Sequence, residues 1–160
     1  MKNLLTLFIL FFTLVSHSQT WTPSPEKGFN EPYVVELEGH SAEAIYKSTL
    51  DWVKETFPDA DEVILSQTEN EQLKFQGISG IAPNQVYVTI NFQFKDGKYR
   101  ATPQRVQFYP SKVDFSTKYM YKKDGSIKKQ NGKVLTSALN LFSQMENGIK
   151  DNLNKEEDDW

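Results

Sequence analysis

The chain has 160 residues, with 18 Lys and Arg against 21 Asp and Glu, no cysteine and two histidines. This length is typical of one domain, and the missing cysteine excludes disulfides, thiol nucleophiles and zinc or copper sites built on thiolates. The mildly acidic charge argues against nucleic acid as a partner, so we expect neither a cofactor nor nucleic-acid binding.

Residues 1–18 have the pattern of a secretory signal peptide. Lys2 supplies a positive charge, residues 4–15 are apolar apart from two threonines, and Ser16 and Ser18 are the small residues expected before a cut after Ser18. The apolar run is too short for a helix to cross a hydrocarbon core of about 30 Å. We therefore predict export, to the periplasm or outside the cell, with no transmembrane anchor left after cleavage. A retained anchor is the alternative.

The next segments predict a leader, a strand and a helix. Residues 19–31 contain two prolines and a glycine without periodicity, which indicates an extended leader. Alternating apolar residues predict a strand over 33–38. Apolar residues at helical spacing then predict a helix over 41–57, with Ser41 as its N-cap and Pro58 as its stop.

Four strand candidates follow, at residues 62–67, 72–79, 86–95 and 98–109. The first two predict a hairpin around Glu69-Asn70-Glu71, whose register stays open. The last two flank Asp96-Gly97, a strong signal for a two-residue hairpin turn. Pro103 predicts an edge or bulge position in the last strand.

The Asp-Gly turn predicts which residues face each other. A two-residue turn places Phe94 opposite Tyr99, and the next pair is Gln93 and Arg100. Phe92, Phe94 and Tyr99 then lie on the core face. The other face is polar and carries Tyr87, Thr89, Asn91, Gln93, Lys95, Arg100 and Thr102. One apolar and one polar face is typical of a sheet covered on one side only.

The last third of the chain predicts one irregular and one helical segment. Residues 119–129 predict either a hairpin about a central Asp-Gly pair or a loose loop, and the order of 110–133 stays open. Residues 134–153 predict a helix, with a stripe formed by Val134, Ala138, Leu141, Met145 and Ile149 and widened by Leu135, Phe142 and Leu153. Residues 155–160 form a charged tail that we expect to be frayed.

The order strand, helix, four strands, helix predicts the α+β class. Because strands linked by hairpins pair antiparallel, we expect a single curved antiparallel sheet with both helices packed on one face. The predicted domain covers residues 32–154.

Five short segments carry a resemblance to a known family. They are Ile45-Tyr46, Trp52-Val53, Asp61–Ile64, Leu73–Gly77 and Phe94–Arg100. Together they resemble a family of exported bacterial proteins that carries a domain of unknown function with a fold like the TATA-binding protein. The likeness covers residues 33–109. The resemblance implies this fold and an exported location, but no catalytic residues, and a shared fold does not imply DNA binding.

Candidate catalytic groups are few. Ser126 and Lys129 have the spacing of a Ser/Lys pair but stand in a predicted polar turn. Asp51 and Glu55 share the polar face of the first helix, whereas a general acid needs burial to raise its pKa. His40 precedes that helix without an identifiable partner. We therefore assign no catalytic and no metal-binding residue.

Two surfaces are candidates for binding. The first lies on the polar face of the sheet and comprises Tyr87, Asn91, Gln93, Arg100 and Thr102. It could bind a peptide, a glycan or another envelope protein. The second is basic and comprises Lys118, Lys122, Lys123, Lys128 and Lys129. It could meet anionic headgroups or an acidic partner. For both surfaces the alternative is an ordinary solvated face.

These patterns favour an exported, non-enzymatic binding or accessory domain of the bacterial cell envelope. Two alternatives stay open. One is a structural, self-associating domain that forms homo-oligomers through an edge strand or a sheet face. The other is a hydrolase that works with carboxylates alone, for which a close pair of carboxyl groups in a cleft would be the minimum sign.

Overall fold

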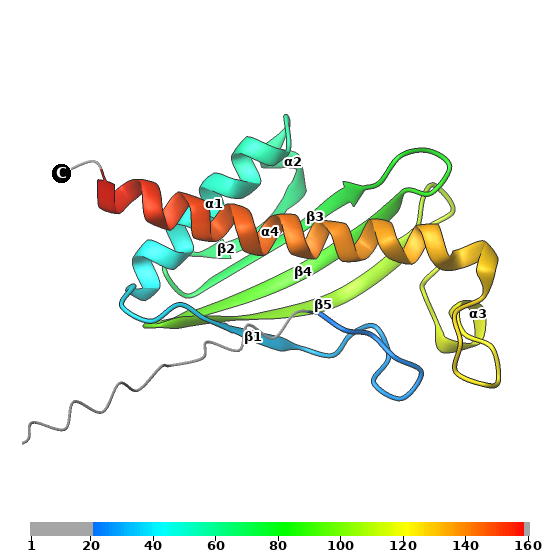
Figure 1. Cartoon of the computed structure of the whole chain (residues 1–160). Helices are drawn as coiled ribbons and strands as arrows, with labels where there is room; N and C mark the ends of the chain where they lie inside the picture. The colour runs from blue at the N-terminus through cyan, green and yellow to red at the C-terminus, as the bar shows by residue number, and fades with distance from the viewer. Residues whose placement is uncertain (1–20, 159–160) are drawn as a thin grey trace, which may run out of the picture.

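The computed structural model describes residues 21–158, and the predicted signal peptide lies outside this range. Its centre is a five-stranded antiparallel sheet in the order β1-β5-β4-β3-β2 (Figure 1). The strands are β1 (Tyr33–Glu36), β2 (Ile64–Thr68), β3 (Gln72–Ser79), β4 (Val86–Lys95) and β5 (Lys98–Phe108). The helices are α1 (Ala42–Thr56), α2 (Ala60–Val63), α3 (Thr117–Met120), the 3-10 turn η1 (Lys129–Asn131) and α4 (Gly132–Asp158). The predicted α+β class is confirmed.

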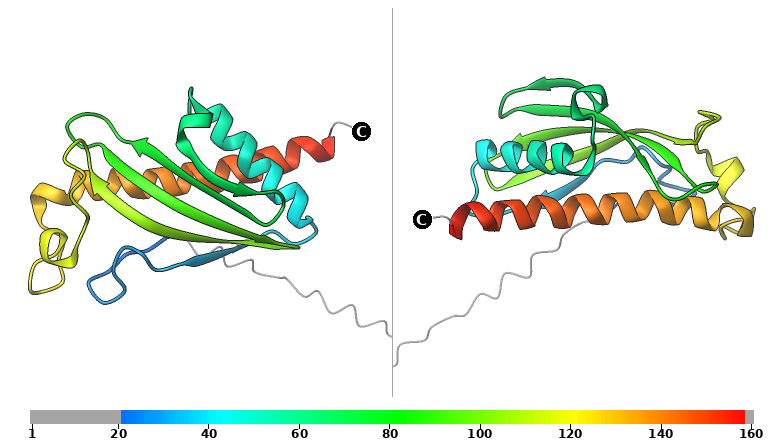
Figure 2. Two further views of the ribbon diagram at one scale, coloured as in Figure 1. Left: turned by 180° about the vertical axis from the view of Figure 1, so that it is seen from behind. Right: turned by 90° about the horizontal axis from the view of Figure 1, so that it is seen from above.

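Both long helices cover the same face of the sheet and leave the other face open, as Figure 2 shows from two sides. The alternation along β4 explains this arrangement. Val88, Ile90 and Phe92 are fully buried under the helices, whereas Gln93 and Lys95 are exposed on the open face. Burying one face against two helices gives the chain a single core.

The helix α1 forms as its capping residues predict. Its N-cap Ser41 accepts a hydrogen bond at Oγ from the backbone N–H of Ala44, at 3.1 Å. This bond satisfies one of the free donors at the helix start. The helix ends at Thr56, two residues before Pro58.

The helix α4 has 27 residues and runs through Asp158, beyond the predicted end at residue 153. It contacts α1 where Trp52 lies directly against Gly148, at a point where a Cβ would collide with the indole ring. Glycine weakens a helix interior, but Gly148 is the residue that lets the two helices approach. Within residues 21–158, none of the helices combines the length and the apolar character needed to cross a membrane.

The β4–β5 hairpin has the predicted register. Phe94 lies opposite Tyr99, and Gln93 lies opposite Arg100. Gly97 has a positive φ of 75° in the turn, the conformation that the Asp-Gly pair predicts. The residues that the prediction placed on the core face, including Phe94 and Tyr99, are buried.

Pro103 stands at a bulge in β5. It lies opposite Ile90, while Arg105 lies opposite Thr89, so one extra residue is accommodated on β5 between the two pairs. β1 pairs only with the first part of β5, at residues 98–101. The prediction of an edge or bulge position is thus confirmed.

The strand predicted over 62–67 is wrong at its start. Residues Ala60–Val63 form the single helical turn α2, and β2 begins at Ile64. Asp59 precedes this turn, and the backbone N–H groups of Glu62 and Val63 donate to its carbonyl oxygen. The turn after Pro58 therefore continues as a helical turn before the chain becomes extended. The β2–β3 hairpin itself is present, with Asn70 at a φ of 60°.

The segment predicted as an extended leader contributes to the core. Trp21 is buried against Phe142 of α4, with ring centroids 4.3 Å apart. Phe29 is buried against Phe115 and Tyr121. Aromatic side chains of this size stabilise a fold by burial even where the backbone has no periodicity.

Residues 110–133 have a defined structure. Tyr121 and Ile127 form an isolated antiparallel bridge around the turn at residues 122–126. The predicted hairpin over 119–129 is thus reduced to this one bridge, because Tyr119 lies in α3 and Lys129 in η1. Phe115 and Met120 are buried. The backbone N–H of Phe115 donates to Val106 of β5 at 2.7 Å, which ties the segment to the sheet.

Two tyrosines carry their hydroxyl groups into the core. Tyr33 and Tyr99 lie on the covered faces of β1 and β5, with 5% and 1% of their surfaces exposed. Burial raises the pKa of both phenols well above the ordinary value, and the nearby Glu146 carboxylate adds to the effect on each. Both side chains are therefore held in the neutral form.

Candidate binding groove

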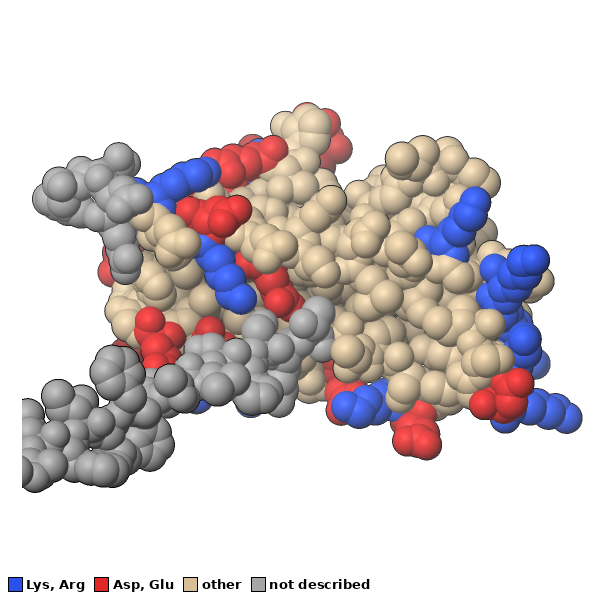
Figure 3. All heavy atoms as spheres, viewed as in Figure 1, with Lys and Arg blue, Asp and Glu red and all other residues tan. Residues whose placement is uncertain are grey.

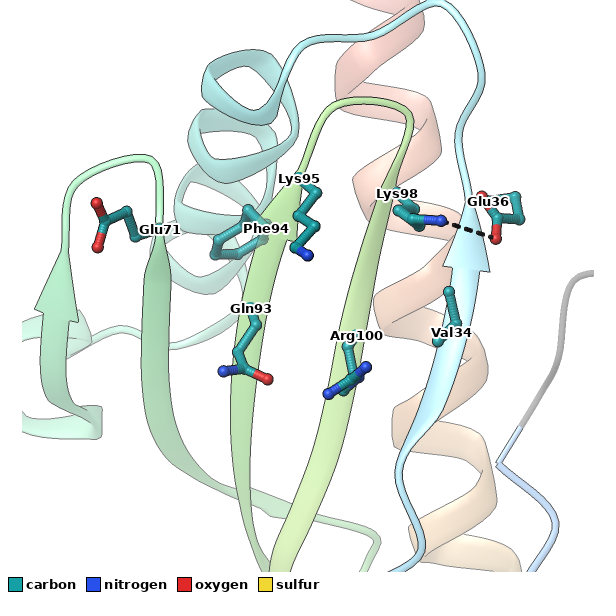
Figure 4. Close-up of a pocket in the computed structure, with 8 residues that line it drawn as sticks. All are labelled: Val34, Glu36, Glu71, Gln93, Phe94, Lys95, Lys98 and Arg100. Carbon is teal, nitrogen blue, oxygen red and sulfur yellow. Dashed lines mark ion pairs between the residues drawn. The ribbon is translucent and has the colours of Figure 1, made fainter.

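A groove of about 670 Å³ lies on the open face of the sheet, beside the β4–β5 turn. We call this end of the molecule the hairpin end. The lining residues are Val34, Glu36, Glu71, Gln93, Phe94, Lys95, Lys98 and Arg100 (Figure 4). They come from β1, β4, β5 and the β2–β3 turn, so segments far apart in the sequence build one depression.

The strand register explains why these side chains meet. Gln93 on β4 pairs with Arg100 on β5, which in turn pairs with Val34 on β1. Residues paired across strands point to the same face. One row therefore crosses three strands, and Figure 4 shows Gln93 and Arg100 side by side in it. The next row contains Lys95, Lys98 and Glu36.

The groove has more cations than carboxylates. Lys98 Nζ lies 3.8 Å from Glu36 Oε1, and about half of each side chain is exposed, so water screens this pair. Lys95 and Arg100 make no ion pair with any residue in 21–158. An arginine can bind a carboxylate through two parallel hydrogen bonds. The arrangement is therefore suited to a ligand that carries a carboxylate.

The predicted sheet-face residues lie in three places. Gln93, Lys95 and Arg100 line the groove. Asn91 and Thr102 pair with each other in the adjacent row, and Asn91 Oδ1 accepts a hydrogen bond from Gln72 at 2.6 Å. These two residues lie beside the groove and do not line it.

Tyr87 lies at the other end of the sheet. Its ring packs on Tyr109 with centroids 5.0 Å apart, and Lys112 Nζ lies 5.6 Å above the Tyr87 ring. Thr89, which we expected to be solvated, is instead 5% exposed, because Gln76 on the neighbouring strand covers it and donates to its hydroxyl at 2.9 Å.

Sequence reasoning missed five groove residues: Val34, Glu36, Glu71, Lys98 and Phe94, the last of which was predicted on the core face. Val34 and Glu36 enter because β1 pairs with β5, more than 60 positions later in the chain. No local pattern indicates this partner. Lys98 follows the Asp-Gly turn directly and lies opposite Lys95. This position on the predicted polar face was the only available indication that Lys98 lines the groove.

The two carboxylates of the groove do not form a close pair. Glu36 is on β1. Glu71 directly precedes β3, and its carbonyl oxygen accepts a hydrogen bond from the backbone N–H of Phe94 on β4. Three strand spacings separate them, about 14 Å. Paired carboxylates of glycosidases lie at most about 9.5 Å apart, so this groove gives the hydrolase alternative no support.

The other end of the molecule, which we call the loop end, comprises residues 80–85 and 109–133. Figure 3 shows Lys side chains gathered there, near α3. Lys118, Lys122, Lys123 and Lys129 are exposed, and Lys128 is half-buried because its Nζ donates to the carbonyl oxygen of Lys118 at 2.7 Å. The predicted basic residues thus lie together on one structured lobe.

Ser126 pairs with an aspartate. Its hydroxyl and its backbone N–H both donate to Asp124 Oδ1, at 2.6 and 2.9 Å. These bonds hold the pKa of Asp124 below its ordinary value. They form a polar turn, as expected, and leave no sign of a Ser/Lys catalytic pair with Lys129. In the described part of the chain, no cluster of three His, Cys, Asp or Glu side chains could hold a metal ion.

Comparison with known proteins agrees with the fold. Residues 33–109 match a family model described as a domain of unknown function (DUF4468) with a TBP-like fold. No curated protein matches the chain.

Two crystal structures are similar. One is a DUF4468 family protein from Bacteroides ovatus, with a TM-score of 0.57 and 15% identity, covering 77% of this chain and 84% of that one. The other is a TBP-like protein from Parabacteroides distasonis, with a TM-score of 0.52 and 12% identity, covering 76% of this chain and 92% of that one. At these identities the likeness concerns the fold alone.

Proposed function

We propose that this chain, whose residues 33–109 form a domain of the DUF4468 family with a TBP-like fold, is an exported, non-enzymatic binding domain of the bacterial cell envelope. Its ligand binds in the groove at the hairpin end. The observation that carries the proposal is the exposed Arg100 beside Gln93 and Lys95, on a sheet face that no helix covers.

The export part of the proposal rests on the first 18 residues. A positive charge, a short apolar run and small residues before the cut are the features of a secretory signal. A binding role, rather than catalysis, is supported by the side chains of the groove. They offer three cations, one amide and two separated carboxylates, but no nucleophile beside a base.

The groove chemistry indicates the class of ligand. Arg100 and Lys95 favour a carboxylate, and Gln93 can both donate and accept a hydrogen bond. The row of side chains runs across the strands and is open to solvent, so it fits an extended molecule rather than an enclosed one. An acidic peptide segment of an envelope protein has these properties, and an acidic glycan is the other candidate.

The test is capture from a detergent-solubilised envelope extract of the host, with the protein purified after export. We expect the wild-type protein to retain a defined partner and Arg100→Glu to lose it, because the substitution reverses the charge that the ligand meets. Arg105→Glu is the matched control, since Arg105 is exposed on the same strand but outside the groove. Equal capture by wild type and Arg100→Glu would refute the groove as the binding site.

Self-association is the second candidate function. β2 is an edge strand, and its Leu65 is 51% exposed. An open edge can pair with a second copy, although the bulge between Ile64 and Ser66 opposes regular pairing there. Light scattering decides between the two, because a monomer at high concentration rules out self-association.

A further inference from the structure

The loop end has a composition unlike the rest of the molecule. Residues 110–133 contain seven lysines and two aspartates, with no arginine and no glutamate. Residues 36–71, which include α1 and α2, contain ten acidic residues and two lysines. The loop end is therefore locally basic, with Lys side chains gathered on it (Figure 3), although the net charge of the chain is −3.

Exposed apolar side chains gather at the same end. Seven large apolar residues in the described range have at least about a third of their surface exposed, and six of them are at or next to the loop end. They are Ile78, Ile81, Tyr109, Val113, Tyr119 and Ile127. Only Leu65 lies elsewhere, on β2. Scattered exposure of single residues needs no explanation, but six at the end that also carries the exposed lysines point to an interaction surface.

Ile81 is the most exposed of these residues, at 85%, and its loop is anchored. Ser79 Oγ donates to the carbonyl oxygen of Ser137 on α4 at 3.0 Å, and Asn84 N–H donates to the carbonyl oxygen of Ile81 at 2.8 Å. Gly80 has a positive φ and lies against Ser137, where a Cβ would not fit. These contacts hold the loop so that Ile81 projects into solvent at a large cost in exposed apolar surface.

We propose that the loop end docks on the surface of an anionic lipid bilayer. Lysines would contact the headgroups, and Ile81 with the exposed tyrosines would enter the interface below them. Tyrosine is the residue type enriched at this depth, and lysine can keep its charge in the headgroup layer while its stem contacts apolar groups. This inference is independent of the groove.

The combination of lysines and exposed apolar side chains favours a bilayer over the other anionic partners. An anionic surface attracts the lysines of the loop end, and the interface below the headgroups can accept the apolar side chains at the same end. A nucleic acid would gain little from exposed aliphatic side chains such as Ile81 and Ile127, because aromatic stacking and phosphate contacts dominate its recognition.

The experiment is sedimentation with phospholipid vesicles, using protein purified after export with its N-terminus determined by mass spectrometry. We expect binding to vesicles of equal parts phosphatidylcholine and phosphatidylglycerol, little binding to pure phosphatidylcholine, and loss of binding at high salt. The double variant Lys122→Gln/Lys123→Gln should lower the partition coefficient roughly 30-fold. Ile81→Ser should lower it roughly tenfold.

Two matched controls test the location. Lys95→Gln/Lys98→Gln also removes two exposed lysines, but at the hairpin end, and should leave vesicle binding within about twofold of wild type. Leu65→Ser removes an exposed apolar side chain on β2 and should have no effect. The proposal is overturned if anionic vesicles fail to bind the protein at low salt, if both lipid compositions bind it equally, or if the Lys95/Lys98 variant loses as much binding as the Lys122/Lys123 variant.

Discussion

The hairpin end and the loop end are ordered by different interactions. At the hairpin end, four strands pair over consecutive residues, and the backbone ladder sets where each side chain points. At the loop end, the chain has one short helix, a 3-10 turn and single bridges. There the order comes from buried aromatic contacts, such as Phe108 with Phe115 at 4.5 Å and Phe29 with Phe115 at 5.4 Å.

The two candidate surfaces therefore differ in how their side chains are held in place. Groove side chains such as Gln93 and Arg100 are placed by neighbouring strands, so their spacing is fixed to the sheet repeat. The lysines of the loop end project from turns around a small aromatic core. A regular row suits a ligand of defined shape, whereas a basic lobe with projecting apolar side chains suits a surface without fixed shape.

The largest expected effect concerns the unfolding free energy and tests whether the loop end unfolds in the same cooperative step as the sheet. Trp52→Ala should cost about 3–5 kcal/mol of unfolding free energy, because it empties the space between α1, Phe75 and α4. Phe115→Ala, at the loop end, should cost about 3 kcal/mol if its aromatic core unfolds together with the sheet. Urea unfolding followed by tryptophan fluorescence measures both.

A loss of unfolding free energy below about 1 kcal/mol for Phe115→Ala would show that the two ends do not unfold together. It would mean that the loop end opens locally without unfolding the sheet. Protease digestion under native conditions then distinguishes the cases, because a locally opening lobe is cut while the sheet stays intact.

The second effect depends on pH and concerns the core below the groove. Folding raises the pKa of Tyr33 and Tyr99, chiefly through burial, whereas in the unfolded chain each phenol ionises near its ordinary pKa of about 10. The unfolded state therefore loses protons first as pH rises. The contribution of these two phenols to the free energy of unfolding should be constant below about pH 10. It should fall as the pH rises further, until the pKa of the folded state is reached.

The double variant Tyr33→Phe/Tyr99→Phe should flatten this alkaline fall, as measured by urea unfolding across a pH series. Tyr119→Phe is the control, since Tyr119 is exposed at the loop end. If Tyr119→Phe flattened the fall as much as the double variant does, the two buried phenols would not be its source.

The smallest effect compares one turn at each end. Gly97 and Gly125 have φ values of 75° and 81°, and nothing lies closer than 4.0 Å to a Cβ built on either. Replacing each with alanine should therefore cost only the backbone strain, about 1–2 kcal/mol. Thermal unfolding measures both. A loss for Gly97→Ala with none for Gly125→Ala would show that the loop-end turn does not form part of the cooperative structure.

The hairpin end was predictable wherever local chemistry sets the geometry. The Asp-Gly turn has two residues, so it fixes the pairing of Phe94 with Tyr99 and of every pair that follows up to the bulge. Period-two alternation then assigns each side chain to a face. Gln93 and Arg100 were found in this way. The stripe of α4 was predicted for the same reason, because helical spacing is also a local pattern.

The rest depends on contacts between distant segments. Nothing near Glu36 indicates that β1 pairs with β5, so the places of Val34 and Glu36 in the groove could not be found. The helical turn α2 has no periodic signal because it is too short to show one. Trp21 and Phe29 are buried in a segment without alternation, and two large aromatic side chains among prolines and glycines were the one available sign that this segment packs on the core.

The helix α4 spans both ends of the molecule as one uninterrupted rod (Figure 1). A helix of 27 residues is about 40 Å long, at about 1.5 Å per residue. Its buried stripe packs on α1 and on β3 and β4, so the helix keeps the groove and the basic lobe at a constant separation. A molecule bound to a bilayer through its loop end would thus hold its groove at a fixed distance from the headgroups.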